Sequence, residues 1–197
     1  KWIYVDYFKP GADLAKAVSE QLTNRSDADV VFLGNHGVVI GGEDVEDVAS
    51  TLRTLISKLQ TKTSQSLAEG SPSPRDPEFL ARGYVPCGDK EISLLTNRSE
   101  LMNRLHHEWA LYPDHVVFLE AKPAILELNF SLLDLNKVAI SKPPFIFAIG
   151  DGVYECIHVT DAQKSQLRCY YDILIRQLSL EKLNPLTDED VTNLLNW

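Results

Sequence analysis

The sequence predicts an α/β protein, and three observations lead to this prediction. The run Val30-Val31-Phe32-Leu33 is continuously apolar and is bounded by turn residues, which is typical of a strand covered on both faces. From Asp44 onward, apolar residues recur at steps of three and four, which predicts an amphipathic helix. Apolar content of 44% and charged content of 24% are those of an ordinary globular protein, so disorder as the main state is not expected.

The first sixty residues predict alternating strands and helices. The helix after Gly42 is the clearest of them, because its first turn carries Glu43, Asp44, Glu46 and Asp47, where the helix dipole favours negative charge. The elements expected in this half are a strand at 2–5, a turn at Pro10-Gly11, a helix at 13–22, a strand at 30–33, a tight turn at 34–37, a strand at 38–40 and the long helix from Glu43 to about Leu59.

Residues 61–83 are rich in Ser, Thr, Pro and Gly and interrupt this pattern, so the stretch predicts a linker. Two domains are therefore expected, at 1–66 and 84–197, and a Pro/Ser-rich linker at 67–83 joins them. The elements expected after the linker are a helix at 99–109, strands at 116–119, 124–128, 137–140 and 145–149, a Gly150-Asp151-Gly152 hairpin turn into a strand at 153–156, and helices capped by Thr160 and Thr187.

Composition excludes several classes of partner and location. The net charge is −9 and Lys and Arg form no cluster, so no nucleic acid is expected as a partner. No apolar run reaches the roughly 18 residues of a membrane helix, so no membrane association is expected. The three cysteines, Cys87, Cys156 and Cys169, lie far apart and lack a framework spacing, which is typical of free thiols in a reducing compartment. We therefore expect a cytoplasmic protein.

The most informative stretch is Val30 to Gly42, in which an imidazole sits on a turn directly after a buried strand. Gly34 and Gly37 flank Asn35-His36 and allow a sharp bend. A neutral imidazole on a rigid corner is well placed to bind a metal. A single histidine after a strand is, however, more often a hydrogen-bonded structural residue, so the residues alone leave both interpretations open.

Residues 1–62 resemble the back half of the class II aldolase/adducin domain. The resemblance is carried by Pro10-Gly11, Leu14-Ala15, Leu33-Gly34-Asn35-His36-Gly37, Gly41 and the helix from Asp44, which match in order and spacing. It implies a three-layer-like class II aldolase domain with a smaller α+β carboxy-terminal extension. In that family the N-H-G histidine is the third imidazole ligand of a catalytic zinc, so the resemblance implies that His36 is a zinc ligand.

The second half is similar to the carboxy-terminal extension of bacterial sugar-aldolase-like members. The similarity rests on residues 113–117, the Gly152 hairpin, Arg168-Cys169-Tyr170 in the Thr160 helix, and residues 194–197. Such members are often described by analogy with short-chain dehydrogenases or rhamnulose-type aldolases. The closely spaced Gly150 and Gly152 lie in a hairpin turn instead of opening a helix, so a dinucleotide site is not predicted.

The chain departs from the family in one respect. The two other zinc imidazoles of the family come from an H-x-H pair, and no H-x-H occurs in these 197 residues. We therefore expect those ligands, the catalytic acid/base and the phosphate-binding loop upstream of Lys1, so the catalytic and substrate-binding residues are unknown within this chain. Alone, the chain is expected to bind zinc weakly or not at all and to be inactive.

The resemblance implies a zinc-dependent aldolase-like lyase of carbohydrate metabolism. Its substrate would be a sugar phosphate or related hydroxy-carbonyl compound, in which zinc polarises the oxygens and stabilises an enediolate without a Schiff base. It also implies a homo-oligomer, by resemblance a tetramer with sites between subunits. Two alternatives remain open: an adducin-like scaffold without catalysis, and a sugar-phosphate dehydratase or epimerase on the same scaffold.

The other histidines are weaker candidates for chemistry. His106 and His107 are adjacent in a predicted helix and point about 100° apart, so they are not expected to share one ion. His115, in a Pro-Asp-His turn, could orient a neighbour or approach an active site across a subunit boundary, while His158 is expected to be structural. Cys87 and Cys169 lack an adjacent base, so no nucleophilic thiolate is expected.

Overall fold

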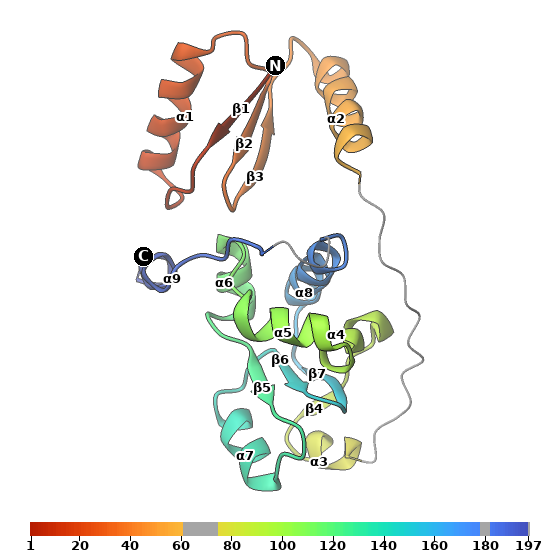
Figure 1. Ribbon diagram of the computed structural model, residues 1–197. Coiled ribbons are helices and arrows are strands. Elements are labelled where there is room, and N and C mark those ends of the chain that lie inside the picture. Colours follow the sequence, from red (N-terminus) through yellow and green to blue (C-terminus); the bar gives the residue numbers. More distant parts are fainter. Residues whose placement is uncertain (61–74, 178–181, 197) are drawn as a thin grey trace. The chain divides into compact units, whose positions relative to one another are not determined.

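The computed structural model describes residues 1–60, 75–177 and 182–196, which form a mixed α/β structure (Figure 1). Contacts divide the chain into two compact units, Lys1–Lys62 with Leu186–Trp197, and Thr63–Pro185. These are the first and the second unit. The last helix, which the sequence predicts within a domain spanning 84–197, groups with the first unit.

The first unit is built on a three-stranded sheet of order β1-β2-β3. Its strands are β1 (Trp2–Val5), β2 (Val30–Leu33) and β3 (Gly37–Ile40). β1 pairs with β2 in parallel, and β2 pairs with β3 as an antiparallel hairpin. Ile3, Val5 and Val31 form the buried centre of the unit, with Ala17, Val18, Ala28 and Leu33 packed against it. The predicted strands of this half are thus confirmed.

The helices of the first unit begin and end close to the predicted residues. They are α1 (Ala12–Asn24), α2 (Val45–Leu59) and α9 (Asp188–Leu195). Asp44 caps α2 by accepting a hydrogen bond from the backbone N–H of Asp47 at 2.9 Å. The predicted Thr187 cap of α9 is confirmed, because Thr187 and Asp190 form a reciprocal capping box.

The second unit contains a four-stranded sheet of order β4-β7-β6-β5. Its strands are β4 (Tyr84–Pro86), β5 (Ala124–Leu126), β6 (Phe145–Ala148) and β7 (Gly152–Cys156). β6 is buried along its whole length, as its apolar sequence requires, and the predicted hairpin joins it to β7. The helical elements are α3 (Asp76–Leu80), the 3₁₀ helix η1 (Lys90–Ser93), α4 (Leu94–Asn97), α5 (Ser99–His107), α6 (Pro113–Leu119), α7 (Leu132–Ile140) and α8 (Asp161–Leu174).

Two predicted strands of the second unit are wrong, because 116–119 and 137–140 lie in helices α6 and α7. Short apolar runs do not distinguish a strand from a buried helical turn. The start signals decide the outcome: Pro113 occupies the first turn of α6, where its missing N–H costs nothing, and Ser131 with Asp134 forms a capping box at the start of α7.

The segment 75–83 is packed into the second unit, although the sequence predicted a linker over 67–83. Residues 76–80 form α3, and Phe79 is fully buried against Phe130 and Tyr154. Burial of the Phe79 ring removes a large apolar surface from water. This stabilises a packed segment even though the surrounding Pro- and Gly-rich composition is typical of a linker. The remainder of the predicted linker, residues 67–74, lies outside the described residues.

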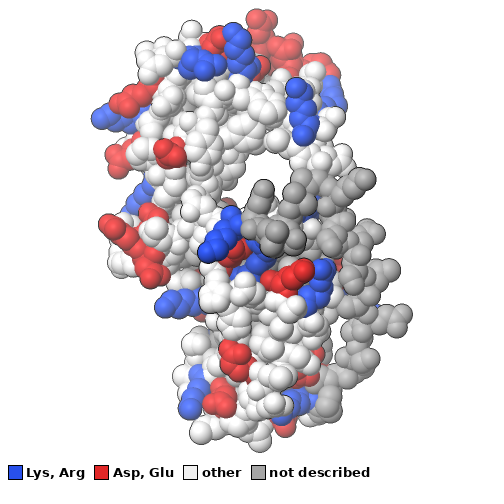
Figure 2. Space-filling view, viewed as in Figure 1, with Lys and Arg blue, Asp and Glu red and all other residues white. Residues whose placement is uncertain are grey.

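The surface carries charges of both signs. On the face drawn in Figure 2, Lys and Arg side chains are interspersed with Asp and Glu, and no extended basic area is seen. Among the described residues, no helix combines the length and the apolar character needed to cross a bilayer.

Candidate functional site

The candidate site is the turn that joins β2 to β3. Leu33 pairs with Gly37 across the hairpin, and the backbone N–H of His36 donates to the Leu33 carbonyl at 3.1 Å. The chain closes this turn by adopting positive φ at Asn35 (57°) and at Gly37 (136°). Asn and Gly are the residues that tolerate such a backbone, so the Asn-His-Gly sequence determines the bend on which His36 stands.

The parallel pairing of β1 and β2 brings the residues that follow both strands together. The Gly34 N–H donates to the Val5 carbonyl at 2.8 Å, which continues the ladder past the last strand residues. A Cβ on Gly34 would lie 2.7 Å from the Tyr4 hydroxyl and 2.9 Å from the Tyr7 backbone nitrogen. Only glycine allows the turn to pack this closely on the segment after β1.

Replacing Gly34 by alanine is expected to lower the free energy of unfolding by about 1–3 kcal/mol, because the backbone of Tyr7 cannot move away as a side-chain end could. Urea unfolding of the full chain measures the change. Gly41→Ala is the matched control, since a Cβ at Gly41 has no atom within 4 Å. Equal stabilities of the two variants would contradict the proposed close packing of the turn.

The His36 ring is half-buried and held from two sides. Its Nε2 lies 2.8 Å from the carbonyl oxygen of Phe8, and its ring stacks on Tyr7 with centroids 5.3 Å apart and planes inclined by 16°. Because a carbonyl oxygen only accepts, Nε2 carries the proton in this contact. In the neutral ring the free lone pair is then on Nδ1, which is the nitrogen that a cation could use.

Tyr7 is a neighbour of His36 that the sequence alone does not predict. Burial, followed by the negative charge of Asp190, raises the pKa of its hydroxyl above the ordinary tyrosine value. The phenol therefore stays protonated at neutral pH, and among the described residues its buried hydroxyl has no hydrogen-bond partner. The signal that could have found Tyr7 and Phe8 is topological: parallel strands end at the same edge of a sheet, so residues after β1 meet residues after β2.

The fit of this corner to a metal ion is incomplete. In the part of the chain that the structure describes, no three or more His, Cys, Asp or Glu side chains come together as a metal site. His36 offers one imidazole on a fixed turn, and a structural zinc requires about four ligands and a catalytic zinc about three. The described residues therefore do not make a zinc site by themselves.

The other histidines and the three cysteines all belong to the second unit. His106 lies 3.9 Å from Glu127, and its ring centroid is 6.2 Å from that of His107. Burial raises the pKa of the Cys87 thiol to about 12, which keeps it protonated and a poor nucleophile. His115 is fully buried among aromatic rings and does not reach the surface.

Comparison with known proteins gives two findings. Residues 1–61 match the family described as the class II aldolase and adducin N-terminal domain. The chain is also 23% identical, over 163 residues, to a curated Bacillus subtilis (strain 168) protein named "Uncharacterized oxidoreductase YuxG". That alignment covers 71% of this chain and 24% of the relative, so the chain spans about a quarter of the relative's length. No solved structure matches the chain.

Proposed function

We propose that the chain is part of a metal-dependent lyase, because residues 1–61 match the class II aldolase and adducin N-terminal domain family. Its reaction would be cleavage of a carbon–carbon bond in a sugar phosphate or related hydroxy-carbonyl compound. In this proposal His36 contributes one imidazole to a divalent-metal site, with zinc as the expected ion.

The observation that supports this role most directly is the contact between His36 and Phe8. Metal-binding histidines nearly always donate their second ring N–H to a carbonyl, carboxylate or water, which fixes the tautomer and the ring orientation. Nε2 of His36 has this partner in the Phe8 carbonyl at 2.8 Å. Stacking on Tyr7 restricts the ring further, so Nδ1 is held in one direction before any cation binds.

The remaining ligands would come from protein outside the described residues. The first unit supports association with further protein, because it exposes apolar side chains on both edge strands and on α2. These side chains are Trp2, Tyr4, Val38, Val39, Val45, Leu52, Ile56 and Leu59. Exposed apolar side chains on edge strands and helices can be buried when protein chains associate, and this supports the proposed homo-oligomer. The three-layer arrangement and the tetrameric state belong to the same proposal.

His36→Ala is expected to lower metal affinity at least about tenfold in the complete natural protein that carries this chain, because one of few ligands is lost. Metal content is measured by mass spectrometry after dialysis against a weak chelator, and retro-aldol activity is measured on a panel of phosphorylated ketoses. Loss of metal and of activity together, with an unchanged circular dichroism spectrum, is the expected result.

His107→Ala is the matched control, since His107 is an exposed imidazole of the second unit. Unchanged metal content in His36→Ala would refute the ligand assignment.

Metal binding without carbon–carbon cleavage, but with loss of water or inversion of a carbinol centre, would favour the dehydratase or epimerase alternative. A protein without metal and without activity would favour the scaffold alternative. The oxidoreductase name of the B. subtilis relative is not transferred, because the chain covers only 24% of it.

A further inference from the structure

A cleft of about 580 Å³ lies within the second unit, beside helix α8 and strand β7. Its size is that of a small-molecule pocket. Among the described residues that line it, three carboxylates (Asp89, Glu155 and Asp172) face two cationic side chains (Lys164 and Arg168). Its other lining residues are Cys87, Gly88, Ile92, Phe145, Ser165, Leu167 and Cys169.

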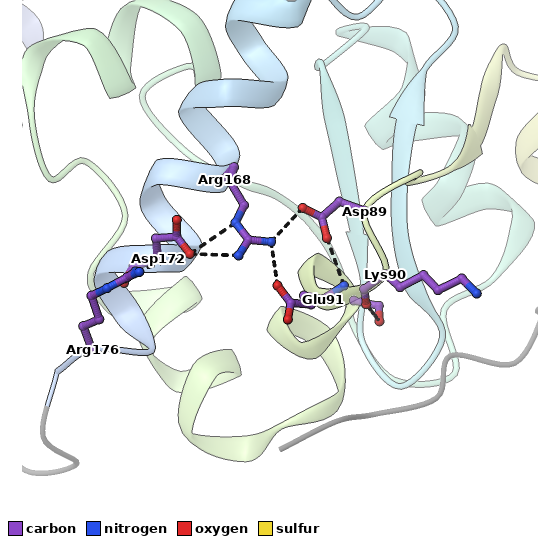
Figure 3. A network of polar contacts seen from close by, with 7 residues as sticks. Asp89, Lys90, Glu91, Arg168, Asp172 and Arg176 are labelled. Atoms are coloured by element: carbon purple, nitrogen blue, oxygen red, sulfur yellow. Dashed lines mark hydrogen bonds and ion pairs between the residues drawn. The ribbon is translucent and has the colours of Figure 1, made fainter. Parts of the chain in front are cut away.

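Arg168 is surrounded by carboxylates. Figure 3 shows its guanidinium between Asp89 and Glu91 on one side and Asp172 of its own helix on the other. The nitrogen–oxygen distances are 3.0 Å to Asp89, 2.6 Å to Glu91 and 3.1 Å to Asp172. Arg176 adds a further contact to Asp172 at 3.3 Å. A phosphate that approached this guanidinium would also be repelled by the three carboxylates around it.

Lys164, one helical turn before Arg168 on α8, is paired in the same way. Its Nζ lies 2.7 Å from Oε1 of Glu155, which is a buried carboxylate. The pKa of the neighbouring Cys87 thiol is raised mainly by burial, and the negative charge of Glu155 raises it further. The charges of the cleft are therefore already paired within the protein before a ligand arrives. An anion gains little here, because each cation is already neutralised by a nearby carboxylate.

The polar groups nevertheless keep hydrogen-bonding capacity. An ammonium has three N–H donors, and Lys164 uses one of them on Glu155. A carboxylate has about four lone-pair positions, and Asp89 accepts from Arg168 and from the Glu91 backbone N–H. Spare donors and spare acceptors side by side match hydroxyl groups, which both donate and accept. Ile92, Phe145 and Leu167 add an apolar wall suited to the C–H groups of a sugar or polyol.

We infer that this cleft is a binding site for a small, neutral, polyhydroxylated compound, with Asp89, Glu155, Lys164 and Arg168 contacting its hydroxyls. This site lies in the second unit and does not depend on a metal at His36. Phosphate esters of the same compound should bind less well, because the cleft carries more negative than positive groups.

The test is a titration of the ¹⁵N-labelled full chain, in which binding is measured by NMR from the amide chemical shifts. The probes are D-ribose, D-fructose, D-mannitol, D-fructose 6-phosphate and spermidine. At least one of the three neutral probes is expected to shift the amide signals of residues 87–92 and 164–172. That probe is expected to bind at least about tenfold more tightly than D-fructose 6-phosphate. Gly88→Val should weaken these shifts, because Gly88 lines the cleft and a Cβ there meets no atom within 4 Å, so the larger side chain fits without displacing its neighbours.

Gly41→Val is the matched control, because it adds the same side chain in open space on the first unit and should leave binding unchanged. Gly88→Ala should give an intermediate loss, which separates gradual filling of the cleft from misfolding. The inference is overturned if none of the neutral probes shifts these amides, if spermidine or the phosphate ester binds there more tightly, or if Gly88→Val binds as well as the wild type.

Discussion

Phe79→Ala is expected to destabilise the second unit by about 3–5 kcal/mol, the cost of removing a large aromatic side chain from a packed core. Phe79 is 0% exposed, and its ring stacks on Tyr154 with centroids 3.5 Å apart. It also meets the edge of Phe130 at 5.9 Å. The substitution leaves a cavity between these two rings that the surrounding side chains cannot fill.

Urea unfolding of the full chain measures this change, with Trp2 and Trp197 replaced by phenylalanine so that Trp109 reports on the second unit. Leu80→Ala is the matched control: Leu80 is the next residue of α3, is 60% exposed, and should cost less than about 1 kcal/mol. Similar values for the two variants would show that α3 does not belong to the core, and the composition-based linker prediction would then stand.

Acidification from pH 7 to pH 5 is expected to destabilise the second unit by about 2 kcal/mol through His115 alone. Burial lowers the pKa of His115 from 6.5 to about 3 in the folded protein. Below pH 6.5 the unfolded chain therefore binds a proton that the folded chain does not, so stability falls as pH drops and continues to fall until about pH 3. Above pH 6.5 both forms are neutral and the contribution vanishes.

The environment of His115 explains why this proton is excluded. The ring is 0% exposed and lies against the edges or faces of Trp109, Tyr112 and Tyr170 at centroid distances of 4.4, 5.4 and 5.0 Å. Neither ring nitrogen has a hydrogen-bond partner among the described residues, so nothing compensates a buried imidazolium.

His115→Phe tests this explanation, because phenylalanine keeps an aromatic ring and cannot be protonated. Between pH 7 and pH 5, the free energy of unfolding of the variant should fall by about 2 kcal/mol less than that of the wild type. The same urea unfolding assay with Trp109 measures both. His107→Phe replaces an exposed imidazole and should keep the wild-type pH dependence. A His115→Phe variant with the full wild-type acid sensitivity would show that another group is responsible.

Local signals in the sequence were sufficient for much of the fold. Turn residues, caps and apolar spacing correctly predicted the β2–β3 hairpin, the β6–β7 hairpin and helices α1, α2, α5, α8 and α9. Reciprocal capping boxes at Thr160 and Thr187 are formed by residues three apart, so they are decided within one helical turn. Where the local signal was a short apolar run, as at 116–119 and 137–140, periodicity could not choose between strand and helix.

For the candidate site, the local sequence was sufficient to predict the corner and its imidazole, because Gly34, Asn35 and Gly37 favour a sharp turn directly after β2. Tertiary structure alone decided which ring nitrogen stays free, since the Phe8 carbonyl reaches His36 only through the parallel pairing of β1 and β2. It likewise decided that Phe79 belongs to a core and that charged residues 89, 155, 164 and 168 line one cleft. The physical reason is the same in each case: these contacts join residues far apart in the chain, and no local propensity encodes the partner.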